Sequence, residues 1–373
     1  MARKPLRKKA RTSLLEAAQQ QDALAGLDKD TQIQHLLRCN NELRRQAASH
    51  IAGFENLKVV IKQALAQPID LRVPKPPRRR RHAWQEVPLL HISDWHLGKV
   101  TSQYNYQVAS ERLLELAKRT IHICDIRRSH SSIEELHLAL GGDMIEGQEI
   151  FASQAYQVDQ DIVEQAVRYG PQRMAEFILM LLQDFKRLTI KAVPGNHGRN
   201  GPKKGPGNPR MNFDSLFYTV TRDLVNQALM KRQPSRLTDI TWDLPWDREE
   251  DWYTLDRILG WGILMVHGHE ISGGFAGFPW YGAGKKAWGW IDTIQEGWDY
   301  MLMGHFHTQS GFDLNRRTVL ANGTVESANH HARQNLAACG SAKQRLAFFN
   351  QEHGLISDDP IYLEPRRPNR SGV

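Results

Sequence analysis

The sequence predicts an α/β protein, and two observations carry that prediction. Five short apolar runs have the length and composition of buried strands, and three longer stretches between them have the pattern of helices. The runs are Leu89 to Ile92, Leu136 to Leu140, Ile190 to Val193, Ile263 to Val266 and Tyr300 to Met303. Helices that cross over between strands are expected at Tyr106 to Arg128, Asp159 to Lys186 and Asp214 to Lys231.

A polar motif follows each of the five apolar runs. In chain order the motifs are Asp94-Trp95-His96, Gly142-Asp143-Met144-Ile145-Glu146, Gly195-Asn196-His197, His267-Gly268-His269 and Gly304-His305-Phe306-His307. Each motif alone has an ordinary explanation, such as a strand-end turn, a helix N-cap or an exposed histidine pair. Because α/β proteins place ligand sites at the carboxyl ends of their strands, five motifs in series predict one shared site.

The residue types in the motifs indicate divalent metal ions. Mixed His, Asp and Asn donors suit Mn²⁺, which we favour, and also Fe²⁺ or Zn²⁺, whereas thiolate-binding metals would need cysteine. A carboxylate shared by two cations holds them roughly 3.5–4 Å apart. A hydroxide that bridges two such ions is a nucleophile, since a bound cation lowers the pKa of water from about 16 toward neutrality. The motifs therefore predict a hydrolytic site with two divalent metal ions.

The five motifs together resemble the calcineurin-like metallophosphoesterase superfamily, whose pattern is DxH, GDxx(D/E), GNH(D/E), a later His-Gly and GHxH. The resemblance covers roughly residues 87 to 330. It implies a four-layer α/β/β/α metallophosphoesterase sandwich, here with an N-terminal helical extension. It also implies that Asp94, His96 and His307 hold the first metal, that Asn196, His267 and His305 hold the second, and that Asp143 bridges the two. His197 then corresponds to the family's non-ligand histidine, which assists at the substrate phosphate.

Three positions leave questions open. Gly198 stands where the family has Asp or Glu after the GNH histidine, so any acidic support for His197 must come from elsewhere or is missing. Glu146 fits the GDxx(D/E) pattern, either as part of the site or as a surface carboxylate. His267 is taken as the ligand of its motif because it ends the apolar run directly, which places His269 behind the ligands or on the substrate side.

The stretch from His91 to Gly98 resembles the opening motif of the bacterial and phage DNA-repair exonucleases of the SbcD type. The expected activity is therefore hydrolysis of nucleic-acid phosphodiester bonds, with a DNA nuclease favoured. A small-molecule phosphodiesterase or phosphatase, acting on a cyclic nucleotide or a dinucleotide, is the alternative. A non-catalytic nucleic-acid-binding scaffold is a further alternative.

The positive charge is concentrated near the start of the chain. The chain has 49 Lys and Arg against 41 Asp and Glu, a formal net charge of +8. Residues 1–87 contain 18 basic and 8 acidic side chains, and the remainder contains 31 and 33. One run consists of Arg78, Arg79, Arg80 and Arg81. Such clusters bind the phosphate backbone without reading sequence, which predicts a nucleic-acid partner; the alternative is a solvated tail that aids solubility.

Three segments are expected along the chain: a basic helical extension at 1–67, a Pro/Arg-rich linker at 68–86 and a catalytic domain at 87–365. In the first segment Leu36, Leu43, Phe54, Leu57 and Ile61 recur at helical spacing. This seam predicts either a homodimer through the helix or packing on the catalytic domain.

Aromatic and basic residues are interleaved between Phe275 and Trp290. Rings beside Lys285 and Lys286 can stack bases and bind phosphates, so these two lysines are predicted nucleic-acid contacts. The alternative is that the tryptophans fill the core. Three scattered cysteines predict neither a disulfide framework nor a zinc cluster, which fits a reducing cytoplasm. No run approaches eighteen apolar residues, so no membrane span is expected.

Overall fold

The computed structural model describes residues 84–148, 154–200, 211–250, 252–272, 278–327 and 341–365, together with scattered positions between 30 and 63. The chain divides into two units, Met1–Lys62 and Gln63–Val373. Every described position between 30 and 62 is helical and exposed. The predicted apolar seam and the run Arg78 to Arg81 lie outside the described residues.

The larger sheet of the second unit has six strands. Their order is β13 (Gly354–Tyr362), β12 (Lys343–Asn350), β2 (Val87–Ile92), β4 (Glu135–Leu140), β5 (Arg187–Ala192) and β6 (Ile240–Asp243). Strands β2, β4, β5 and β6 are parallel, and β12 and β13 add an antiparallel edge. The parallel part is built from strand–helix–strand units, as the sequence predicts.

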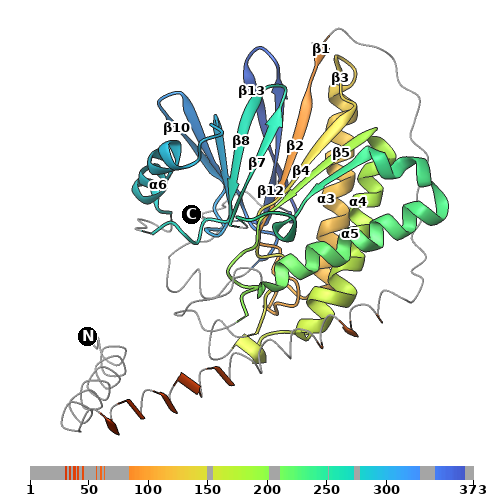
Figure 1. The fold of residues 1–373 in the computed structure, drawn as a ribbon. Helices are drawn as coiled ribbons and strands as arrows, with labels where there is room; N and C mark the ends of the chain where they lie inside the picture. Colours follow the sequence, from red (N-terminus) through yellow and green to blue (C-terminus); the bar gives the residue numbers. More distant parts are fainter. Residues whose placement is uncertain are drawn as a thin grey trace, which may run out of the picture. The chain divides into compact units, whose positions relative to one another are not determined.

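Three long helices lie together on one side of this sheet (Figure 1). They are α3 (Tyr106–Arg127), α4 (Tyr169–Asp184), which follows a π-helical turn at Glu164–Arg168, and α5 (Phe213–Arg232). Asn105 caps α3 by accepting a hydrogen bond from the Val108 N–H, and Asn212 caps α5 by accepting from the Asp214 N–H. Capping of this kind stabilises a helix by about 1 kcal/mol.

The second sheet has five strands. Their order is β10 (Ser310–Leu314), β11 (Arg317–Ala321), β9 (Tyr300–Met303), β8 (Trp261–Val266) and β7 (Tyr253–Ile258). Strands β8, β9 and β11 are parallel. Helix α6 (Trp280–Thr293) packs on this sheet through Ala283, Ala287 and Trp290. A small separate sheet pairs β1 (Trp84–Gln85) with β3 (Ser131–Ser132).

The two large sheets share one apolar core. Leu89 and Ala139 from the first sheet pack in the same cluster as Met265 and Leu302 from the second. Burying a side chain of this size stabilises the fold by about 1.5–3 kcal/mol. The predicted α/β class is therefore confirmed, and so are the five strands and the three crossover helices; the number of layers stays a prediction.

The loops at the carboxyl ends of both sheets are hydrogen-bonded to one another. The Asp94 N–H donates to Gly142 O, the Gly304 N–H to His267 O, and the Val325 N–H to Asp94 O. The polar motifs that follow five of the strands therefore lie at one place.

No described helix combines the length and the apolar composition of a membrane-spanning segment.

Candidate metal centre

The backbone is strained at the motif residues. Among the described residues, seven non-glycine residues have positive φ, and five of them are motif residues: Asp94, His96, Asp143, His305 and His307. A left-handed backbone costs an L-residue on the order of 1–3 kcal/mol, and such strain persists where the surroundings hold it for function. The sharp turns aim these side chains into a shared space at the strand ends.

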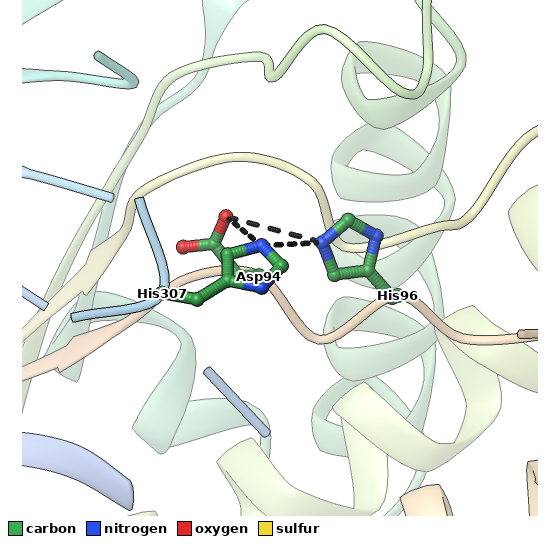
Figure 2. Close-up of side chains that lie close together, drawn as sticks. All are labelled: Asp94, His96 and His307. Atoms are coloured by element: carbon green, nitrogen blue, oxygen red, sulfur yellow. Dashed lines mark hydrogen bonds and ion pairs between the residues drawn. The ribbon is translucent and has the colours of Figure 1, made fainter. Parts of the chain in front are cut away.

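The first cluster contains Asp94, His96 and His307, which point toward one another in Figure 2. Nε2 of His96 lies 3.1 Å from Nε2 of His307, and Asp94 Oδ1 lies 3.3 Å from His307 Nε2 and 3.9 Å from His96 Nε2. Donors bound to one ion at roughly 2.0–2.2 Å are themselves roughly 3–4.4 Å apart. The three side chains therefore have the spacing of a metal site.

The far side of each histidine in this cluster is held by a carboxylate. His96 Nδ1 donates to Glu146 Oε2 at 2.8 Å, and His307 Nδ1 lies 2.9 Å from Glu326 Oε1. A proton held on Nδ1 directs the Nε2 lone pair at the ion, which is the usual arrangement of metal-binding histidines. Two Nε2 atoms that face each other need a cation or a proton between them.

The second cluster contains Asp143, His267 and His305. His267 Nδ1 donates to Gly141 O at 2.7 Å, and its Nε2 lies 3.1 Å from Asp143 Oδ2 and 3.1 Å from Asn196 Oδ1. Nε2 thus faces two oxygens that are acceptors, which again calls for a cation. Asp143 also belongs to a third group of close donors, with His96 and His197. Asp143 is therefore placed between the two clusters, where a bridging ligand is predicted.

The buried carboxylates attract positive charge. Burial opposes ionisation, yet the neighbouring histidines hold the pKa of Asp94 below its usual value and that of Asp143 well below it. Burial lowers the pKa of His267 and His307, but the charges of Asp143 and Asp94 overcome it and raise each to about 10. Without metal, protons on these two histidines supply the charge that the site demands.

Glu146 answers one of the questions that the sequence leaves open. Its side chain is buried, and its Oε2 lies 3.2 Å from His197 Nδ1 as well as 2.8 Å from His96 Nδ1. The Glu146 carbonyl, 3.0 Å from His197 Nδ1, and Gln154 Nε2, 3.3 Å from it, complete the surroundings of that nitrogen. Glu146 is thus part of the site and supports His197 with negative charge.

The same charge sets the protonation of His197. Burial lowers its pKa, but Glu146 and Asp143 raise it to about 9. A histidine that is positive at neutral pH can give a proton to a leaving oxygen or stabilise its charge.

The space beside Gly198 explains why no acidic residue stands there. A Cβ on Gly198 would lie 2.4 Å from Asn212 Oδ1 and 2.8 Å from the Asp214 nitrogen. The buried Asp214 carboxylate instead accepts hydrogen bonds from the N–H groups of Asp143 and Gly195 at 2.8 Å, and from Met144 at 3.1 Å. One carboxylate at the start of α5 therefore ties the second motif to the third.

Two motif glycines are required by close packing. A Cβ on Gly195 would lie 2.1 Å from Asp143 Oδ1, and a Cβ on Gly142 would lie 2.6 Å from the Gly195 nitrogen. Gly142 also has a φ of +88°, which favours glycine. Glycine is thus required at these two motif positions because the two loops pack tightly around Asp143.

The remaining predicted residues are placed as follows. The His269 ring lies 5.5 Å from that of His267 and 6.3 Å from that of His305, beside the second cluster and outside the three groups of close donors. Lys285 and Lys286 are exposed on α6. The tryptophans of that helix differ in burial: Trp290 is in the core, whereas Trp280 and Trp288 are exposed. Core packing alone therefore does not account for this segment.

Four side chains at the site were not predicted: Lys99, Gln154, Asp214 and Glu326. All four support the motif residues, and all four lie outside the five motifs. The only available signal is position, since Lys99 follows the first motif by three residues and Glu326 follows a buried strand end.

The donor set fits divalent cations. It offers imidazole, carboxylate and amide donors in two adjoining clusters, which suit Mn²⁺, Fe²⁺ or Zn²⁺. Asp94, His96 and His307 would hold one ion, and Asn196, His267 and His305 the other, with Asp143 between them.

Comparisons with known proteins give distant matches. No protein-family model matches the chain. The SPbeta prophage-derived uncharacterized protein YonJ of Bacillus subtilis is 22% identical over 261 residues, which are 68% of this chain and 56% of that protein. The chain thus spans little more than half the length of this curated relative.

Solved structures with a similar arrangement include Vps29 from Entamoeba histolytica in complex with zinc, at 10% identity, a TM-score of 0.32, and coverage of 74% of this chain and 99% of that one. A predicted phosphoesterase from Streptococcus pneumoniae matches at 11% identity and a TM-score of 0.29, over 75% of this chain and 99% of that one. An archaeal phosphodiesterase matches at 9% identity and a TM-score of 0.33, over 74% of this chain and 99% of that one.

Proposed function

We propose that the chain is a two-metal phosphodiesterase that hydrolyses nucleic-acid strands, with DNA the favoured substrate. The observation that carries the proposal is the pair of donor clusters joined at Asp143, with His197 close to His96 and Asp143. Two divalent cations bound there would supply an activated water and neutralise charge on the phosphodiester. Pairs of ions of this kind serve phosphatases, nucleases and polymerases, in which they stabilise the attacking and leaving oxygens at phosphorus.

The chain's own residues provide orientation and a proton. Glu146 fixes Nδ1 of His197, so Nε2 is the nitrogen that meets the substrate. A protonated Nε2 donates to the leaving oxygen of the phosphodiester as the bond to phosphorus breaks. His269 lies beside the second cluster, with its ring 5.5 Å from that of His267.

Two features support a nucleic-acid substrate over a small ester. One is the charge of residues 1–87, with 18 basic and 8 acidic side chains, which includes Arg78 to Arg81. The other is the outer face of α6. Tyr281 and Trp288 are 81% and 55% exposed, and they lie seven residues apart on one helix face with Lys285 between them.

A chain of aromatic contacts joins the start of α6 to the metal centre. The Phe306 ring, which lies between His305 and His307 in sequence, is 5.5 Å from the Phe278 ring, and Phe278 is 4.5 Å from Trp280. Exposed rings with lysines nearby bind single-stranded nucleic acid by stacking and by phosphate contact. We therefore include Lys285 and Lys286 in the substrate surface.

The test uses the full chain with Mn²⁺ on end-labelled single- and double-stranded DNA, RNA, a cyclic dinucleotide and bis-p-nitrophenyl phosphate. Replacing Arg78, Arg79, Arg80 and Arg81 by Gln should weaken nucleic-acid binding. It should also flatten the dependence of log K on log salt by about 0.7–0.9 for each phosphate that the variant no longer binds. Hydrolysis of bis-p-nitrophenyl phosphate should keep the parent rate.

The matched control is the double change Lys186→Gln and Arg187→Gln. These exposed residues lie at the start of β5, at the end of the strand away from the site, and their replacement should leave binding unchanged. Cleavage of the cyclic dinucleotide with no cleavage of any strand would make the chain a small-molecule phosphodiesterase. Strand binding with no hydrolysis of any substrate would make it a scaffold.

A further inference from the structure

Lys99 occupies an unusual position directly behind the first donor cluster. It follows the first motif, and its side chain is only 14% exposed. Its Nζ lies 2.7 Å from Glu326 Oε2 and 3.8 Å from Glu146 Oε2. These are the two carboxylates that hold His307 and His96 by their Nδ1 atoms.

We infer that Lys99 is a positioning residue that holds the first metal site together through both carboxylates. The inference rests on the metal site of the proposed function. Lys99 reaches His307 through Glu326, and it reaches His96 and His197 through Glu146, because Glu146 Oε2 lies near both rings. One ammonium group therefore orients three histidines without touching substrate or ion.

Charge explains why a lysine is needed there. Glu146 and Glu326 are 5% and 1% exposed, and two buried carboxylates of like charge destabilise each other. Lys99 lies between them as the cation, and their charges raise its pKa although burial lowers it. Without Lys99, the two carboxylates would repel each other and turn away, and each histidine would lose the fixed acceptor that keeps Nε2 directed at the ion.

The backbone that carries one of the two carboxylates is fixed independently of Lys99. Thr324 Oγ1 donates to Asp94 O at 2.9 Å and accepts from the Glu326 N–H at 3.1 Å, and the Val325 N–H donates to Asp94 O at 3.2 Å. The backbone that carries Glu326 is thus tied to the first motif. Loss of Lys99 should change charge and side-chain orientation while the loop stays in place.

The experiment compares Lys99→Met with Lys99→Arg and with Lys191→Met in the full chain. Lys191 is a matched control, because it is similarly shielded and forms an ion pair at 2.9 Å with Asp243 and not with a carboxylate of the site. The probe is Mn²⁺ alone, measured by equilibrium dialysis and by electron paramagnetic resonance, which distinguishes two adjacent ions from one.

We expect Lys99→Met to bind one ion with the parent affinity and the other about 10–100-fold more weakly, as for other residues that support metal ligands. Lys99→Arg should restore binding at the first site, since it restores the charge, and Lys191→Met should bind both ions. Glu326→Gln keeps Lys99 and should weaken binding of the same ion. This variant therefore tests the inference if Lys99→Met does not fold.

Parent affinity for both ions in Lys99→Met, or in Glu326→Gln if Lys99→Met is unfolded, would overturn the inference. So would an equal loss in Lys191→Met. These outcomes differ from failure of the proposed function, in which the parent chain binds no pair of ions or hydrolyses no phosphodiester.

Discussion

The His96 Nδ1 atom lies 2.8 Å from Glu146 Oε2, so a carboxylate of the second motif holds a histidine of the first. The same oxygen lies 3.2 Å from His197 Nδ1. Glu146 therefore links a predicted ligand to the predicted proton donor, and changes at these residues should separate metal binding from chemistry.

Glu146→Gln should lower turnover by about 10–100-fold and also weaken metal binding. The amide keeps the shape of the side chain but removes the charge that raises the pKa of His197 and supports His96. Turnover of bis-p-nitrophenyl phosphate and Mn²⁺ affinity, measured side by side, check this. Parent values for both would show that Glu146 contributes neither to metal binding nor to turnover.

His197→Gln should leave the metal content unchanged while turnover falls by a factor on the order of 10² or more, because the proton donor is removed. His197 also lies in a group of close donors with His96 and Asp143, so metal content is the deciding measurement. Loss of an ion in this variant would make His197 a ligand.

Asp214→Asn should lower the free energy of unfolding by about 2–3 kcal/mol, because hydrogen bonds to a buried charged group are worth about 1.5–3 kcal/mol each. The Asp214 carboxylate accepts from Asp143, Met144 and Gly195 N–H groups, and an amide can present only one oxygen to them. Urea unfolding measures the change. Asp223→Asn, on the same helix and outside this hydrogen-bond set, is the control and should be within about 0.5 kcal/mol of the parent.

Tyr281→Ala with Trp288→Ala should weaken binding of single-stranded DNA by about 1–3 kcal/mol per stacked base. Both rings are exposed, so the fold and the hydrolysis of bis-p-nitrophenyl phosphate should be unaffected. Ile126→Ala, an exposed apolar residue at the end of α3, controls for loss of surface area. Unchanged DNA affinity in the double variant would remove α6 from the substrate surface.

The sequence predicts the strands and the motif residues well because both signals are local. An apolar run of four or five residues marks a buried strand, and a polar motif at its end marks the site. The five motifs then meet because β2, β4 and β5, and likewise β8 and β9, are parallel neighbours or near neighbours in their sheets.

Local sequence patterns do not predict the supporting residues, because their partners are distant along the chain. Lys99 pairs with Glu326, and Asp214 binds loops that begin about seventy and twenty residues earlier. Gly198 is the clearest example. From the sequence, it stands where the family pattern has an acidic residue, and the reason is not visible. In the structure, Asn212 and Asp214 occupy the space that an acidic side chain would need.

Metal removal should destabilise the protein, because Asp94 and Asp143 are buried and of like charge. Chelation should lower Tm, and Mn²⁺ at about 100 times its Kd should restore about 2.7 kcal/mol per site. Calorimetry with and without the chelator measures this. Identical Tm values in both conditions would contradict a metal centre in the folded chain.

The most direct test of the two-metal account is the number of Mn²⁺ ions bound per chain in the parent and in Asp143→Asn, measured by equilibrium dialysis with turnover on the same samples. Asp143 is placed between both clusters, so its loss leaves two cations without the shared negative charge. We expect two ions and phosphodiester hydrolysis in the parent, and at most one ion with turnover abolished in the variant. Two ions and parent turnover in Asp143→Asn would contradict it.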